Sequence, residues 1–207
     1  MLRRPPLGHK DKTAHDMSRE RRVMSALKKQ YPYVPEVLAF GDDEVLGGEY
    51  YVMEKLEGLI LRRDIPKGRQ FSEDEARGIC FSFIDKLIEL HQVDYKRAGL
   101  CNLGDPKGYI KRQIEGWYKR LLKVETDDMP SFDNIHHWLV AMMPEEKGNC
   151  IVHNDFRLDN LVLDQDNLEH VVGVLDWEMT TLGDPLMDLG KTLSYWVEPN
   201  DAPGFQL

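Results

Sequence analysis

The sequence has few cysteines. There are three in 207 residues, Cys80, Cys101 and Cys150, which is an odd number. They are far apart and lack the close spacing of metal-binding cysteine pairs. Such a set is typical of free thiols in a reducing compartment and does not indicate a disulfide scaffold. We therefore expect an intracellular protein, cytoplasmic by default.

Long apolar runs and a basic excess are also absent. No run approaches the roughly 20 apolar residues that span a bilayer, and prolines rather than an apolar signal core follow the first basic residues. The net charge is −9, whereas nucleic-acid-binding proteins usually carry a basic surface. With 42% hydrophobic and 30% charged residues, the composition predicts a soluble globular protein with no membrane span and no nucleic-acid partner.

What the sequence does contain is a polar motif near its C-terminal end. The segment I-V-H-N-D-F-R-L-D-N is followed by two apolar β-type runs, at residues 161–163 and 171–175, with a polar turn between them. This pattern predicts a hairpin, with Asp155 and Asn160 before its first strand and Asp176 after its second. Carboxylate and carboxamide oxygens suit Mg²⁺, which usually keeps waters and shares itself with substrate phosphates.

The spacing within this motif is more informative than its composition. His153, Asp155 and Asn160 give H-x-D-x-x-x-x-N, which matches the kinase catalytic loop except for the middle residue of its first triplet. In that scheme Asp155 accepts the proton of the attacking hydroxyl, Asn160 holds one Mg²⁺, and Asp176 bridges the metal to the β- and γ-phosphates. The alternative is a set of ordinary turn residues, which leaves the acid after the second buried strand unexplained.

The segments H-N-D-F-R-L-D-N-L-V and V-L-D-W-E-M-T-T-L-G-D-P-L-M-D-L closely resemble the aminoglycoside phosphotransferase and choline kinase-like family. Within it, the chain is most similar to kinase-like domains found alone or fused to acyl-CoA dehydrogenases. The resemblance runs from Leu2 to about Trp196, with one departure, Asn154 in place of the usual glycine. It implies an α+β, protein kinase-like two-lobe fold that uses ATP and Mg²⁺.

The resemblance also implies a domain organisation. Residues 1–57 match part of the N-terminal lobe, with a helix and a hinge but an incomplete sheet. Residues 58–207 match a mostly helical C-terminal lobe that carries the catalytic β-hairpin and is truncated at its end. The two strands and the phosphate-covering loop that normally come first have no counterpart, so we expect a fragment of a longer kinase domain.

Two charged residues of the N-terminal lobe are candidates for the nucleotide site. Arg3 falls where the family has a cation that contacts the α- and β-phosphates, and Glu20 matches the helix glutamate that pairs with that cation. Glu20 lies in an amphipathic helix predicted over residues 14–29. The alternatives are a disordered terminal cation for Arg3 and a surface acid for Glu20.

The hinge is the next candidate. The sequence predicts a strand over residues 36–40 and a second strand that ends near Glu54 and leads into M-E-K-L-E-G. In the family, backbone groups at this place bind the adenine edge. The resemblance therefore implies that the backbones of Glu54, Lys55 and Leu56 do so here.

Polar capping residues predict where the remaining helices begin: Ser72 with Glu75, Asp105 before Pro106, Ser131, and Asp184 before Pro185. The first of these helices runs to about His91, which we interpret as a structural residue. Asp184 and Asp188 are candidates to support the metal site from behind, although a capping role explains Asp184 equally well.

Together these features favour an ATP- and Mg²⁺-dependent phosphotransferase that acts on a small-molecule hydroxyl. D-W-E in place of D-F-G and the lack of an A-P-E segment after Asp176 favour a small acceptor over a protein. The dehydrogenase-fused relatives imply a hydroxyacyl-CoA as acceptor, a longer chain as partner, and a mitochondrial or peroxisomal location if the chain is fused. Aminoglycosides, choline and sugars remain open.

Two other function classes compete with this interpretation. The missing strands favour a catalytically inactive kinase-like binding or regulatory module, or an inactive fragment of the full kinase domain. A divalent-metal hydrolase has little support, because the motif lacks the histidine-rich ligand sets of common metallohydrolases.

Overall fold

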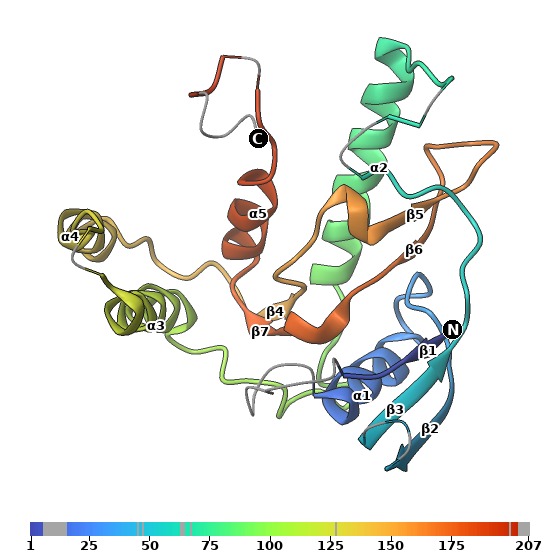
Figure 1. Ribbon diagram of the computed structural model, residues 1–207, viewed down its shortest axis with the longest axis horizontal. Coiled ribbons are helices and arrows are strands. Elements are labelled where there is room, and N and C mark those ends of the chain that lie inside the picture. The colour runs from blue at the N-terminus through green and yellow to red at the C-terminus, as the bar shows by residue number, and fades with distance from the viewer. Residues whose placement is uncertain are drawn as a thin grey trace.

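The computed structural model describes residues 1–5, 16–44, 46, 48–62, 65–66, 68–126, 128–198 and 200–202. Its first elements are β1 (Leu2–Arg3), α1 (Met17–Leu27), β2 (Val37–Asp43) and β3 (Gly48–Met53). The three strands form an antiparallel sheet in the order β1-β3-β2. Figure 1 shows this sheet and α1 together at one end of the molecule.

The helix α1 packs its apolar face on this sheet. Asp16 caps it by accepting a hydrogen bond from the backbone N–H of Arg19 at 2.8 Å. Val23, Met24 and Leu27 are buried at helical spacing. The predicted amphipathic helix is confirmed over these residues; the first two positions of the predicted range lie outside the described residues.

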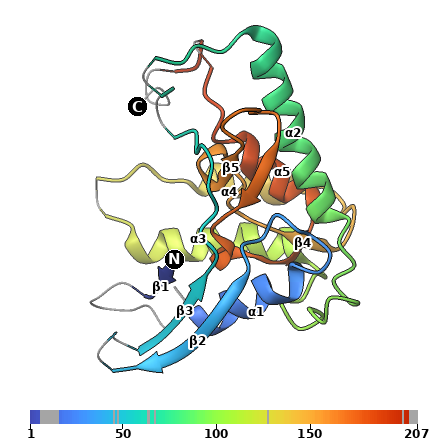
Figure 2. The same ribbon diagram turned by 90° about the vertical axis from the view of Figure 1, so that its right-hand side faces the viewer.

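A long helix, α2 (Glu73–His91), lies at the other end of the molecule (Figure 2). Ser72 and Glu75 form the predicted capping box: the Ser72 hydroxyl accepts from Glu75 N, and the Glu75 carboxylate accepts from Ser72 N. The buried residues Ile79, Phe83, Leu87 and Leu90 form the apolar face of the helix. The helix packs against elements that flank the predicted catalytic motif, among them β4 (Cys150–Val152) and β6 (Val171–Val174).

Those elements are two short strand pairs and a final helix. They are β4 (Cys150–Val152) with β7 (Thr181–Gly183), β5 (Leu161–Leu163) with β6 (Val171–Val174), and α5 (Pro185–Leu193). Both pairs are antiparallel, and Leu161 lies opposite Val174. The predicted hairpin is therefore confirmed. Its strands are buried, which holds the motif residues at either end of the hairpin in place.

Close contacts join this hairpin to the N-terminal sheet. Trp177 is fully buried and donates its indole N–H to the carbonyl of Val174 at 2.9 Å. A Cβ on Gly173 would lie 2.0 Å from a methyl carbon of Leu56 and 3.1 Å from the carbonyl oxygen of Tyr33, so glycine permits this close approach without displacing the Leu56 side chain. The backbone N–H of Val174 also donates to the carbonyl of Tyr33 at 2.8 Å. The hairpin and the segment before β2 are thus fixed against each other.

Two helices stand apart, α3 (Tyr109–Val124) and α4 (Asp133–Ala141). The predicted start of α3 at Asp105-Pro106 is wrong. Instead the carboxylate of Glu146 accepts the N–H groups of Gly108 and Ile110 at 3.0 and 3.1 Å and caps the helix from a distant segment.

The predicted cap of α4 at Ser131 is early by one residue, since Phe132 holds the cap position. The Ser131 hydroxyl nevertheless accepts from Asp133 N at 3.2 Å. In contrast, Asp184 caps α5 as predicted, accepting from Leu186 N at 2.9 Å. Across the described ranges, no helix is both long and apolar enough to cross a membrane.

Candidate active site

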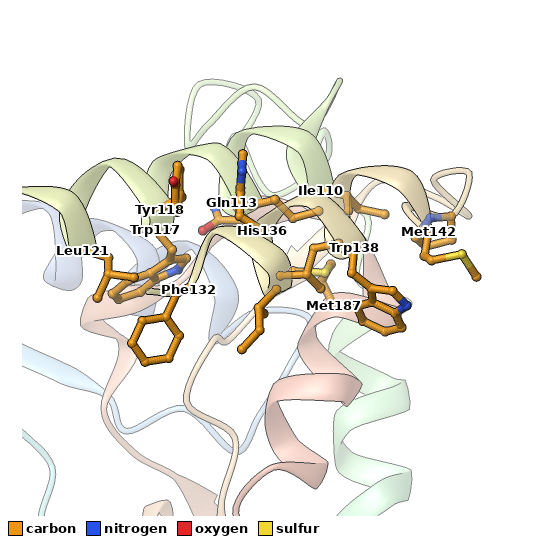
Figure 3. A pocket seen from close by; sticks show the side chains of 14 residues that line it. Ile110, Gln113, Trp117, Tyr118, Leu121, Phe132, His136, Trp138, Met142 and Met187 are labelled. Carbon is orange, nitrogen blue, oxygen red and sulfur yellow. The ribbon is translucent and has the colours of Figure 1, made fainter. Parts of the chain in front are cut away.

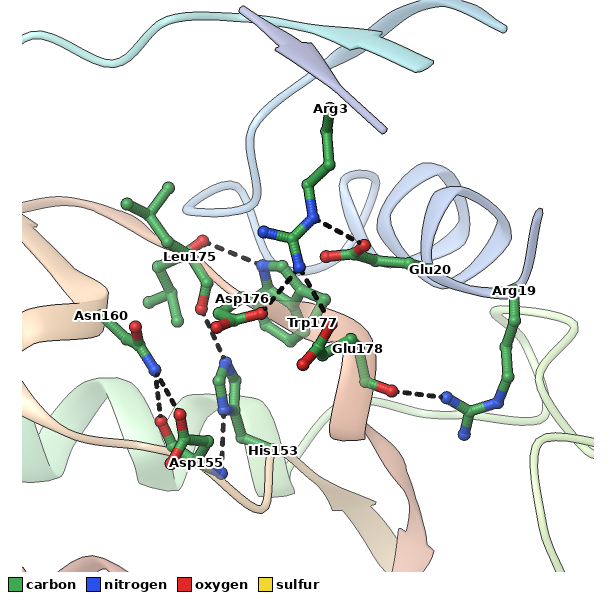
Figure 4. Close-up of polar contacts among 11 residues, drawn as sticks. Arg3, Arg19, Glu20, His153, Asp155, Asn160, Leu175, Asp176, Trp177 and Glu178 are labelled. Atoms are coloured by element: carbon green, nitrogen blue, oxygen red, sulfur yellow. Dashed lines mark hydrogen bonds and ion pairs between the residues drawn. The ribbon is translucent and has the colours of Figure 1, made fainter. Parts of the chain in front are cut away.

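The predicted catalytic loop, called the catalytic loop below, lies between β4 and β5, and its residues Asp155 and Asn160 are hydrogen-bonded to each other. The amide nitrogen of Asn160 donates to Oδ2 of Asp155 at 2.9 Å and to the Asp155 carbonyl at 2.8 Å (Figure 4). The other carboxylate oxygen, Oδ1, accepts from the hydroxyl of Tyr195 at 2.7 Å. Burial, followed by this hydrogen bond, raises the pKa of Tyr195 to about 12. Asp155 is therefore held from both sides.

A buried carboxylate fixes the start of this loop. Asp188 on α5 is fully buried and accepts the backbone N–H groups of His153 and Asn154, each at 2.8 Å. Nε2 of His91 lies 3.0 Å from the same carboxylate. His91 is therefore a structural residue, as predicted. Asp188 supports the catalytic loop through the buried backbone N–H groups of His153 and Asn154.

His153 braces the loop from within. Its Nε2 lies 3.0 Å from the carbonyl of Leu175, and its Nδ1 lies 3.2 Å from the backbone N–H of Asp155. The two contacts together define a neutral imidazole that donates at Nε2 and accepts at Nδ1. Burial lowers the pKa of His153, with the charge of Asp188 opposing that shift. The ring joins the loop to the end of β6 and has no exposed surface for chemistry.

Asn154 stands where the family usually has glycine, and its backbone adopts a conformation that glycine favours. Its φ is 63°, in the left-handed region that glycine adopts freely and that asparagine tolerates better than most residues. Its side chain is also used, because Oδ1 accepts from the hydroxyl of Tyr109 at 2.9 Å and Nδ2 donates to the Met179 carbonyl at 3.1 Å. The substitution therefore keeps the loop conformation and adds two hydrogen bonds.

Asp176 follows directly after the hairpin and close to the loop. The backbone N–H of Leu175 donates to the carbonyl of Asn160 at 2.8 Å, which joins the end of β6 to the end of the catalytic loop. Asp176 itself has a positive φ of 65°. Strained backbone of this kind in non-glycine residues is concentrated at functional sites.

Arg3 reaches the same place from the sheet. Its Nε donates to Glu20 at 3.0 Å, and its Nη2 donates to Asp176 at 3.0 Å and to Glu178 at 3.1 Å (Figure 4). Glu20 is 2% exposed. Burial raises the pKa of its carboxyl, and the charge of Arg3 works against that rise. The predicted pair of Arg3 and Glu20 is thus formed, and Glu178 is a further partner that the sequence did not single out.

A cavity of about 170 Å³ lies between the sheet and the hairpin. Its polar lining includes Arg3, Glu20, Asn160 and Asp176, and its apolar lining includes Met53 and Ile60. Four of the predicted site residues therefore face one space, with Asp155 bonded to one of them.

The hinge residues lie beside this cavity rather than in its lining. The N–H of Glu54 donates to the carbonyl of Glu36 at 2.8 Å, so this donor is already used within the sheet. The Glu54 side chain accepts from Glu36 N at 3.1 Å, and the Lys55 side chain pairs with Glu57 at 2.7 Å. The side chain of Leu56 packs against Gly173. The backbone groups that could still bind an adenine edge here are the carbonyl of Glu54 and the N–H and C=O groups of Lys55 and Leu56.

The donor set at the hairpin suits a hard cation. Asn160 uses its amide nitrogen for Asp155, which leaves its oxygen as a ligand, and Asp176 uses Oδ1 for Arg3. Across the described residues, no three His, Cys, Asp or Glu side chains are grouped to hold a metal. Two oxygen ligands are what Mg²⁺ needs when phosphates and water complete its shell.

A second hollow lies between α3 and α4. The apolar groove, as we call the space of about 590 Å³ between α3 and α4, is lined by aromatic, aliphatic and methionine side chains that include Trp117, Phe132 and Trp138 (Figure 3). A neighbouring cavity of about 320 Å³ shares Trp117 with it and also holds Asn154, Arg120 and Lys191.

Comparison with known proteins places the chain in a family. Residues 1–205 match the phosphotransferase enzyme family, so the chain belongs to that family. The chain is 34% identical over 204 residues to mouse acyl-CoA dehydrogenase family member 10, which covers 98% of this chain but 19% of the mouse protein. It therefore spans about a fifth of that relative's length.

Solved structures agree with the fold. A protein of Ralstonia eutropha, provisionally assigned as an aminoglycoside phosphotransferase, is 35% identical, with a TM-score of 0.78 over 89% of this chain and 56% of that one. An aminoglycoside phosphotransferase of Streptomyces rimosus, solved with ADP and streptomycin, is 20% identical, with a TM-score of 0.58 over 87% and 68% of the two chains. The predicted α+β, protein kinase-like fold is confirmed.

Proposed function

We propose that this protein is an ATP- and Mg²⁺-dependent phosphotransferase that acts on the hydroxyl of a small molecule. One observation carries the proposal: Arg3, Glu20, Asn160 and Asp176 line one cavity, and Asn160 is hydrogen-bonded to the candidate base Asp155. A related fold holds ADP in the Streptomyces rimosus enzyme. The family membership of residues 1–205 supports the same reaction class.

In this proposal the protein aligns two reactants and holds one proton. Asp155 orients the acceptor hydroxyl and takes its proton as the hydroxyl oxygen bonds to the γ-phosphorus, while the bond from that phosphorus to the ADP oxygen breaks and ADP leaves. Asn160 keeps the carboxylate oriented through its bond to Oδ2 at 2.9 Å. Arg3, positioned by Glu20, turns its guanidinium to the phosphates when nucleotide is present. Alignment and charge neutralisation are the main sources of catalysis in phosphoryl transfer.

Asn160 and Asp176 would hold the Mg²⁺, which neutralises phosphate charge when it is bound. Arg3 contacts one of these candidate ligands, at 3.0 Å from Asp176. We therefore expect Mg²⁺ to compete with Arg3 for the Asp176 carboxylate, and the nucleotide phosphates to compete with Asp176 for the guanidinium. This exchange needs only a side-chain movement, because Arg3 keeps Glu20 as a second partner.

For the acceptor we propose a hydroxyacyl-CoA. The apolar groove between α3 and α4 offers about 590 Å³ lined mainly by apolar side chains, which suits an acyl chain. Arg120 and Lys191 line the adjoining cavity, and neither pairs with a carboxylate among the described residues. Two cations without a carboxylate partner in the described residues suit the phosphates of coenzyme A. The mouse relative, named as an acyl-CoA dehydrogenase family member, supports the same class.

The test is the formation of phosphorylated product. Hydroxyacyl-CoA, choline and an aminoglycoside are each offered with Mg·ATP, and the products are resolved by mass spectrometry. We expect phosphorylated hydroxyacyl-CoA, and a loss of about 10² in kcat or more in Asp155→Asn because the general base is removed. We also expect Trp117→Ala to raise the KM for the acyl-CoA about tenfold with little change for ATP.

Each failure has a distinct meaning. Product from choline or the aminoglycoside alone would refute the acyl-CoA class but keep the phosphotransferase. Tight binding of Mg·ATP with no product from any acceptor would refute the enzyme and favour a kinase-like binding module. Asp94→Asn serves as the matched control, since Asp94 is an exposed turn residue that accepts two backbone N–H groups far from the loop in sequence.

A further inference from the structure

The hydroxyl of Tyr195 occupies a hydrogen-bonding position on Asp155 that the acceptor hydroxyl needs in the proposed reaction. Its Oη donates to Oδ1 of Asp155 at 2.7 Å, which is the hydrogen bond that a general base makes with the hydroxyl it deprotonates. The second carboxylate oxygen is already bonded to Asn160 at 2.9 Å. A hydroxyl that approaches Asp155 along the same direction must therefore compete with Tyr195.

The side chain is held on one face and open on the other. The guanidinium of Arg157 lies 5.0 Å from the ring centroid of Tyr195, which is within the range of a cation–π contact. The next residue, Trp196, packs its ring edge-on against Phe83 with centroids 5.9 Å apart. Tyr195 is nevertheless 38% exposed. A side chain held in this way is ordered and yet can be displaced without disturbing the core.

Resting on the function proposed above, we propose that Tyr195 is an internal stand-in for the acceptor hydroxyl. It holds Asp155 and keeps water from Oδ1 until an acceptor replaces it. Asn160 maintains the carboxylate orientation whether or not Tyr195 is bonded. Tyr195 is thus a positioning residue that selects against transfer to water.

The wasteful reaction that it limits is ATP hydrolysis. In that reaction Asp155 takes a proton from water, the water oxygen bonds to the γ-phosphorus, and the bond from that phosphorus to the ADP oxygen breaks, giving ADP and phosphate. Loss of the Tyr195 hydroxyl opens Oδ1 to water and to acceptor alike. The prediction is therefore faster hydrolysis without acceptor and a lower acceptor KM with little change in kcat.

The experiment measures ADP release from Mg·ATP in the absence of any acceptor. Tyr195→Phe removes the hydroxyl and keeps the ring that Arg157 contacts. We expect its rate to rise about fivefold, the equivalent of one ordinary hydrogen bond, and to fall to background when Asp155→Asn is added. Tyr33→Phe is the matched control, because it loses a tyrosine hydroxyl that bonds Lys86 at 2.7 Å on another part of the fold.

Thermal melting with and without Mg·ATP separates the possible failures. If every variant is stabilised by Mg·ATP but Tyr195→Phe hydrolyses it no faster than the wild-type protein, the stand-in role is wrong and the proposed function stands. If Mg·ATP stabilises none of the proteins, the proposed function itself is wrong. A fall in kcat for hydroxyacyl-CoA with unchanged KM in Tyr195→Phe would also overturn the stand-in role.

Discussion

The buried carboxylate of Asp188 gives a quantitative test of how the catalytic loop is held. It is 0% exposed and accepts the backbone N–H groups of His153 and Asn154, each at 2.8 Å. Its Oδ2 also lies 3.0 Å from Nε2 of His91. The carboxylate thus serves three donors at a position that is itself closed to solvent.

Asp188→Asn keeps the shape and removes both the charge and one acceptor. Oδ1 serves Asn154, while Oδ2 serves His153 and His91. Either orientation of the amide therefore places its NH₂ group against a buried N–H donor. A hydrogen bond to a charged group contributes about 1.5–3 kcal/mol, and an unsatisfied buried donor costs about 1–3 kcal/mol. We expect a loss of about 3 kcal/mol, which lowers Tm by roughly 6–12 °C in a chain of this size.

The assay is urea unfolding followed by fluorescence and circular dichroism, with thermal melting as a second measure. Asp94→Asn is the control, because Asp94 accepts two backbone N–H groups at 3.0 Å in an exposed turn where water replaces them. Its effect should be much smaller. A free energy of unfolding for Asp188→Asn within about 0.5 kcal/mol of wild type would refute the argument that buried donors depend on this carboxylate.

Two further predictions concern the same loop. Because burial lowers the pKa of His153 from its ordinary value of 6.5, protonation is favoured in the unfolded state, and the free energy of unfolding should fall as pH drops below about 6.5. Urea unfolding at pH 7.5 and 5.5 measures this, and an equal pH dependence in His153→Gln would contradict it. At Asn154, where φ is 63°, both Asn154→Gly and Asn154→Ala lose the side-chain bonds, but only alanine adopts the left-handed backbone at a cost of about 1–2 kcal/mol. Alanine should be the less stable variant by that amount, and equal stabilities would show that the loop relaxes.

The parts of the fold that were predicted depend on short stretches of sequence. Three features were predicted from residues that are close together in the sequence: the hairpin, the capping box at Ser72 and the amphipathic face of α1. The residues of the catalytic loop are five positions apart, and the loop is fixed by the strands on either side. Local pattern is therefore enough to place Asp155 next to Asn160.

The parts that were missed depend on distant partners. The N-terminus of α3 is capped by Glu146, whose carboxylate lies 36 positions along the chain from Ile110, so the local Asp105-Pro106 signal led to the wrong start. Tyr195 lies 40 positions from Asp155 and belongs to no motif that marks its role. Asn154 is an intermediate case, since the sequence marked it as a departure from the family glycine, whereas its left-handed backbone and its hydrogen bonds to Tyr109 and Met179 come from the structure.

The central claim is that Arg3, Asn160 and Asp176 form a site for Mg·ATP. Isothermal titration calorimetry of ATP, with and without Mg²⁺, tests it most directly in the wild-type protein and in Asp176→Asn. We expect Mg²⁺ to strengthen ATP binding in the wild type, with this gain lost in Asp176→Asn and kept in Asp94→Asn. Equal ATP affinity of the wild type and Asp176→Asn in the presence of Mg²⁺, or no ATP binding with Mg²⁺ present, would show that these residues do not form the site.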